Sequence, residues 1–185
     1  MNNAESDLVI LKVAFLLSAV DGRIDESERA MFRKLSEQCK DIDVKAAEKI
    51  VPEMEAAAIQ LAGAKATLSE KAFLDLFMKE VGLFCDWPAF VKNSIQVRKA
   101  FVMWIAMSTA DGDFSAIERK ALSRIRKLVN SFEMIDDGFL CAVEKHVMVA
   151  HKAVASLSKA STLEASKRVH ERVDRAYSAL SSLIG

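Results

Sequence analysis

An acidic turn that occurs twice limits what this chain can fold into more than any other feature of its sequence. The first copy covers residues 18–29 and the second covers residues 108–119. Each copy contains, at the same spacing, a serine, an Asp-Gly pair, an apolar residue two positions after the glycine, and a Glu-Arg pair. The offset between the copies is 90 residues (111 − 21 = 90). A helical pattern alone would not keep polar residues in register over that distance, so the sequence indicates an internal duplication.

The fold class follows from the spacing of the apolar residues, which recur at helical intervals along nearly the whole chain. Glycine and proline are scarce, with 6 and 2 residues, which favours helices over a turn-rich β fold. The pattern predicts eight helices, near residues 4–20, 25–39, 44–63, 69–86, 94–110, 116–129, 137–158 and 162–184. We therefore expect an all-α fold, a compact and internally duplicated bundle of about seven to eight helices.

The duplication also predicts how the chain is organised. Residues 1–135 are expected to form the duplicated domain, and residues 136–185 a C-terminal helical extension that packs on it. Pro52 conflicts with the third helix, because an interior proline removes a hydrogen bond, so that helix is expected to be kinked or to start at Val51. The last helix carries an apolar stripe that needs a partner, either the bundle or a second chain. That stripe consists of Val169, Val173, Tyr177, Leu180 and Ile184.

The bulk composition excludes several classes of function. The 26 basic residues equal the 26 acidic residues, so no overall field would attract nucleic acid. Charged residues interrupt the long apolar stretches, and we expect no transmembrane segment. Cys39, Cys85 and Cys141 form no Cys-x-x-Cys pair, which is typical of reduced cysteines in a cytoplasmic protein. We interpret Cys39 and Cys141 as small core residues.

The first interpretation of the repeated turn is structural. The Asp-Gly pair would end one helix, and Asp25 or Ser115 would cap the next by accepting a hydrogen bond from the backbone N–H of Glu28 or Glu118. Each glutamate can reach back to its cap, and such caps contribute about 1 kcal/mol each. On this interpretation the acidic residues serve only to begin and end helices.

The second interpretation is a divalent-cation site, because helix capping gives Asp21 and Asp111 no role. An anionic side chain near a helix C-terminus is mildly unfavourable. Aligned on its glycine, the turn contains the second half of a calcium loop and lacks the first half. One turn alone supplies too few oxygen atoms, so the two turns would have to share a calcium-like ion. The candidate metal ligands are Asp21, Asp25, Glu28, Asp111 and Glu118.

These two turns resemble those of the TerB family, the tellurite-resistance and stress-associated domain that also precedes some DnaJ-type co-chaperones. The resemblance covers roughly residues 5–130 and rests on an Asp-Gly pair with a glutamate six positions after the glycine. It implies a duplicated helical bundle without established catalysis, whose acidic residues are proposed to hold a metal ion. The positions that match the motif are Asp21, Glu28, Asp111 and Glu118. The second copy departs from the first at Ser115, which corresponds to Asp25.

Other groups of residues offer little support for an enzyme. His146 and His151 are five positions apart, on different faces of a helix, whereas a zinc pair needs a spacing of three or four. We interpret these two and His170 as surface or capping histidines. Two hypotheses follow: a cation-binding scaffold for protein partners, or a metal-free, co-chaperone-like adaptor. The adaptor would use an apolar groove or form a homodimer through its C-terminal helix.

Overall fold

The computed structural model describes residues 1–21, 26–39, 42, 44–84, 86–129, 134–157 and 162–184. Within these ranges every regular element is a helix, which confirms the all-α prediction. In chain order they are α1 (Asn3–Ser18), the 3₁₀ helix η1 (Ala19–Asp21), α2 (Glu26–Gln38), α3 (Val44–Thr67), α4 (Glu70–Gly82), α5 (Trp87–Phe90), α6 (Ser94–Ser108), α7 (Ala116–Leu128), α8 (Asp137–Leu157) and α9 (Leu163–Ile184). In the described part of the chain, no helix combines the length and the apolar character that crossing a membrane requires.

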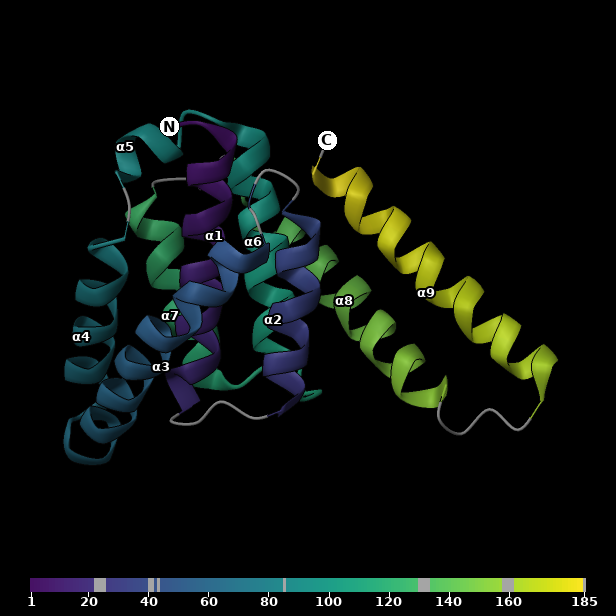
Figure 1. Cartoon of the computed structure of the whole chain (residues 1–185), viewed down its shortest axis with the longest axis horizontal. Coiled ribbons are helices and arrows are strands. Elements are labelled where there is room, and N and C mark those ends of the chain that lie inside the picture. The colour runs from purple at the N-terminus through teal and green to yellow at the C-terminus, as the bar shows by residue number, and fades with distance from the viewer. Residues whose placement is uncertain are drawn as a thin grey trace.

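The central pair of the bundle consists of α1 and α6, which lie side by side and run in the same direction (Figure 1). Three hydrogen bonds join them, from Gln96 to Asn3, from Lys99 to Asp7, and from the Trp104 indole to the Ile10 carbonyl. The partners are 93, 92 and 94 residues apart, close to the offset of the sequence repeat. The two helices are therefore parallel, and their C-terminal ends, at Ser18 and Ser108, lie at the same end of the bundle.

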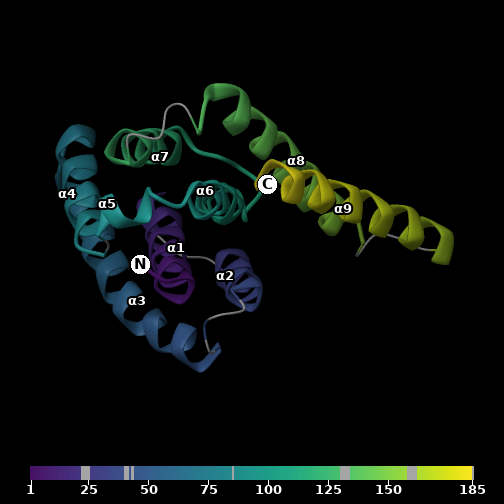
Figure 2. The same cartoon turned by 90° about the horizontal axis from the view of Figure 1, so that it is seen from above.

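The helix that follows each member of this pair contacts the other member. α2 of the first half packs on α6, while α7 of the second half packs on α1 (Figure 2). α1 and α6 are buried along most of their length, as expected for helices enclosed by others. Met103, Trp104 and Met107 of α6 are buried. η1, which follows α1, contacts both α3 and α7.

The last two helices form a hairpin that extends away from the bundle (Figures 1 and 2). α8 and α9 pack on each other along their length, and each also contacts α6. In the figures only the base of the hairpin lies against the bundle, and its far end stands clear of the other helices. The apolar stripe of α9 is divided accordingly, since Leu180 is buried and Tyr177 is 40% exposed.

Two expectations from the sequence differ from the structure. The alternative start of the third helix at Val51 is wrong, because α3 is continuous from Val44 to Thr67, while the alternative of a kink at Pro52 stays a prediction. Pro52 is exposed while Ile50 and Met54 are buried, so packing on both sides of the proline compensates for its missing hydrogen bond. The interpretation of Cys141 as a core residue is wrong, because that cysteine is exposed on α8. Cys39 is buried as expected.

Candidate functional site

The second acidic turn is held together by its own side chains. Gly112 has a φ of 97°, a left-handed backbone conformation that residues other than glycine rarely adopt. The Asp111 carboxylate accepts a hydrogen bond from the Asp113 backbone N–H at 2.9 Å. α7 then begins with a capping box, in which Ser115 N–H donates to Glu118 Oε2 at 2.8 Å and Glu118 N–H donates to Ser115 Oγ at 3.3 Å. Glu118 therefore acts as a helix cap, as the structural interpretation predicted.

The first acidic turn is described only in part. η1 ends at Asp21, whose side chain lies outside the described residues, as does the whole of Asp25. Glu28 is only 7% exposed and lies in the first turn of α2. Within the described ranges, no three His, Cys, Asp or Glu side chains gather into a group that could hold a metal ion. The shared cation site across Asp21, Asp25, Glu28, Asp111 and Glu118 stays a prediction.

A cation links the second turn to the hairpin. The Arg119 guanidinium lies 4.3 Å from the centre of the Phe114 ring and donates to the Phe114 carbonyl at 3.2 Å. It also donates to Glu144 of α8 at 2.7 Å. This hydrogen bond lowers the pKa of the Glu144 carboxyl and raises the pKa of Arg119. The turn and the base of the hairpin are thus joined through one arginine.

A crevice of about 720 Å³ lies between α2, α6 and the base of the α8–α9 hairpin. We call it the α2–hairpin crevice. Its walls are mostly aliphatic and include two methionines, while its few polar groups lie on α2, α8 and α9. A concave apolar surface with a small number of polar groups is the usual form of a binding site. Its lining includes Met31 and Lys34 of α2, Met103 of α6, His151 and Val154 of α8, and Tyr177 of α9.

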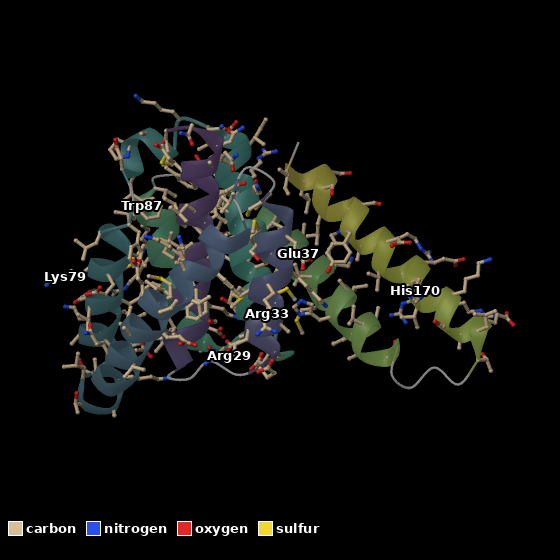
Figure 3. All side chains as sticks on the ribbon, in the orientation of Figure 1. Arg29, Arg33, Glu37, Lys79, Trp87 and His170 are labelled. Atoms are coloured by element: carbon tan, nitrogen blue, oxygen red, sulfur yellow. The ribbon has the colours of Figure 1, made fainter. Side chains whose placement is uncertain are left out.

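The charged side chains of this crevice lie on its α2 wall. Lys34 and Glu37 are three positions apart on α2 and both line the crevice. Figure 3 shows Glu37 near the upper end of α2, above Arg33 and Arg29. Arg29 and Arg33 line a different pocket of about 310 Å³ that also includes Val51 of α3. The crevice therefore presents one positive and one negative group against an apolar background.

His151 connects the crevice to the second acidic turn. Its Nδ1 lies 2.7 Å from the carbonyl oxygen of Thr109, the residue that caps the C-terminus of α6. A carbonyl can only accept, so Nδ1 carries the proton and Nε2 keeps a lone pair. Burial lowers the pKa of the imidazole and nearby Lys34 lowers it further, whereas the Thr109 hydrogen bond and Asp111 oppose the shift. Burial therefore favours the neutral form of His151, and the hydrogen bond to Thr109 orients its ring.

The sequence interpretation of the histidines is partly confirmed. His151 caps a helix C-terminus as expected, but it is half-buried and does not lie freely on the surface. His170 lies on α9, away from the bundle (Figure 3). The role of His151 in the crevice was not predicted, because the helices that surround it are distant in sequence.

Comparisons of this chain with protein-family models, with curated proteins and with solved structures found no match. The geometry of the crevice and of the turns therefore carries the functional argument.

Proposed function

We propose that this protein is a non-catalytic, TerB-like interaction module that binds an amphipathic helix of a partner protein in the α2–hairpin crevice. The observation that carries the proposal is the crevice itself, an aliphatic concavity of about 720 Å³ walled by four helices. Grooves between helices commonly receive the apolar face of another helix, whose anchors lie at positions i, i+3, i+4 and i+7. Methionine side chains such as Met31 and Met103 adapt to the shape of what they contact.

Charge complementarity favours a helix with a particular polar edge. Lys34 and Glu37 lie about one helical turn apart along the α2 wall. A helix that lies along this wall would match them with an acidic and a basic residue spaced three or four positions apart. The rest of the occupant's buried face would be apolar. A peptide with this pattern is therefore the expected partner segment.

Exposed apolar residues on the crevice wall support the same proposal. Val154 is 37% exposed and Tyr177 is 40% exposed, and both line the crevice. Their apolar surface faces solvent until an occupant covers it, which stabilises the complex by about 25 cal/mol for each Å² buried. Val149 on the same helix is 36% exposed but does not line the crevice, so it offers a matched control.

The experiment selects binders of the purified protein from a displayed library of helix-forming peptides. The affinity of each enriched peptide is then measured by fluorescence anisotropy. We expect amphipathic peptides whose affinity falls at least tenfold in V154R and is unchanged in V149R. Circular dichroism of both variants shows that the fold is retained. Equal loss of affinity in both variants, or no enrichment, would contradict the proposal. If V154R instead abolished self-association of the chain, the occupant would be a second copy.

The cation hypothesis is a separate proposal about the two turns. A calcium-like ion bound there would brace the turns against each other and, through Thr109 and Arg119, the base of the hairpin. The assignment to a stress-response role and the cytoplasmic location likewise rest on the TerB resemblance and the composition. They do not alter the test of the crevice.

A further inference from the structure

His151, which lines the α2–hairpin crevice, carries a hydrogen-bond acceptor that no residue in the described part of the chain uses. The Nδ1–H of His151 is already donated to the Thr109 carbonyl at 2.7 Å. Among the residues that the structure describes, none hydrogen-bonds to Nε2. An occupant that covered this nitrogen without supplying a donor would bury an unsatisfied acceptor, which is unfavourable. The occupant must therefore bring an N–H or O–H group to this position.

The charges around His151 limit what kind of donor suits it. Lys34 approaches from α2 and Asp111 from the turn after α6, and Glu37 lines the same crevice. Burial lowers the pKa of the imidazole and so favours its neutral form. A cationic donor from the occupant would lie beside Lys34 and would lose its hydration against the aliphatic walls, which is costly for a charge. A neutral donor on an otherwise apolar side chain satisfies both the lone pair and the aliphatic walls.

We infer that the occupant helix inserts a tryptophan, whose indole N–H donates to Nε2 of His151. This inference rests on the proposed function. Indole is a large apolar ring with one donor and no acceptor, so it leaves no second polar group to satisfy. Met31 and Met103 line the crevice, and thioether sulfur packs favourably on aromatic rings. The Lys34 ammonium, on the same wall, adds an attraction to an indole face.

The test uses indole and 1-methylindole, which have nearly the same shape but differ in the N–H donor. Each is titrated into the isotope-labelled full chain, and binding is followed through the methyl resonances of Ala106, Ala150 and Val154, all of which line the crevice. The unmodified protein should bind indole about five- to tenfold more tightly than 1-methylindole, the effect of one hydrogen bond. Equal affinities would overturn the inference.

The variant H151N is the matched control, because the asparagine amide can still donate to Thr109 but offers nothing in place of Nε2. In this variant the preference for indole should fall to about one. A preference that persists in a folded H151N protein would overturn the inference.

The peptide selection separates the failure of this inference from failure of the proposed function. Enriched helices that depend on Val154 but lack tryptophan would overturn the inference and leave the function standing. No enrichment would overturn both.

Discussion

The buried ion pair between Asp7 of α1 and Lys99 of α6 gives the sharpest prediction about the architecture. Lys99 Nζ lies 2.6 Å from Asp7 Oδ1, and the two side chains are 22% and 3% exposed. Replacing Lys99 by methionine keeps most of the side-chain volume but leaves the Asp7 carboxylate buried and unpaired. Removing one partner of a buried pair costs about 3–5 kcal/mol. Because Lys99 keeps some contact with water, we expect the lower end, about 3 kcal/mol.

The free energy of unfolding is measured by urea denaturation, with circular dichroism as the signal that reports unfolding. In a chain of this length, about 3 kcal/mol corresponds to a fall in Tm of roughly 6–12 °C. The matched control is K120M, because Lys120 lies 2.8 Å from Glu70 but both side chains are about half exposed, at 53% and 55%. Exposed pairs contribute about 0–1 kcal/mol. The double variant D7N/K99M should recover much of the lost stability, since no unpaired charge is then buried.

A cost for K99M below about 1 kcal/mol, or one equal to that of K120M, would refute this reasoning. It would mean that water reaches Asp7 and that the pair does not fix α1 against α6. The parallel register that places both turns at one end would then depend on apolar packing and on the Trp104–Ile10 hydrogen bond.

Three further predictions concern the turn, the cysteines and the cation. G112A should lose about 1 kcal/mol of stability, because Gly112 has a φ of 97°. G63A should gain about 0.5–1 kcal/mol, because Gly63 lies within α3 and has open space around it. Thermal unfolding of both variants measures these changes, and equal effects would contradict the prediction. Iodoacetamide should label Cys141 in the native protein and leave Cys39 unmodified from pH 7 to 9. Burial and Asp7 raise the pKa of Cys39 to about 12, so its thiolate forms only as the pH approaches that value. Peptide mapping identifies the labelled cysteine, and labelling of Cys39 in the native protein would contradict its burial. Titration with calcium, magnesium and manganese should shift the amide resonances of both turns if they share an ion, and no shift at millimolar metal would remove the cation from the account.

The helices were predictable from sequence because their apolar spacing and their caps are local. The helix predicted near residues 116–129 is observed at Ala116–Leu128, and its capping box at Ser115 forms as expected. These features depend on residues close in sequence. The parallel pairing of α1 and α6 was not predicted, because it depends on contacts between residues 92 to 94 positions apart.

The crevice was not predictable in the same way, because it depends on how far the hairpin departs from the bundle. The apolar stripe of α9 was recognised, yet nothing local states that Tyr177 stays exposed while Leu180 is buried. On α8, Val147, Ala150, His151 and Val154 recur at helical spacing and all line the crevice. That spacing was the available signal, but the contact of His151 with Thr109 joins residues 42 positions apart.

The assignment of the acidic residues shows the same division. Glu118 could be assigned from a short motif, and the structure confirms its hydrogen bonds to Ser115. Asp111 could not, because its contact with Asp113 depends on the left-handed backbone at Gly112. Predicting a shared cation site would require the relative positions of the two turns, and those positions depend on the tertiary structure.

The most direct test of the central claim is the set of intermolecular NOEs between a selected helical peptide and the methyl groups of the labelled protein. We predict NOEs to Ala150, Val154 and Leu180, all of which line the α2–hairpin crevice. The chain offers other exposed apolar residues, Ile59 at 73% and Leu83 at 71% exposure, neither of which lines the crevice. NOEs confined to those residues would contradict the claim that the crevice is the binding site.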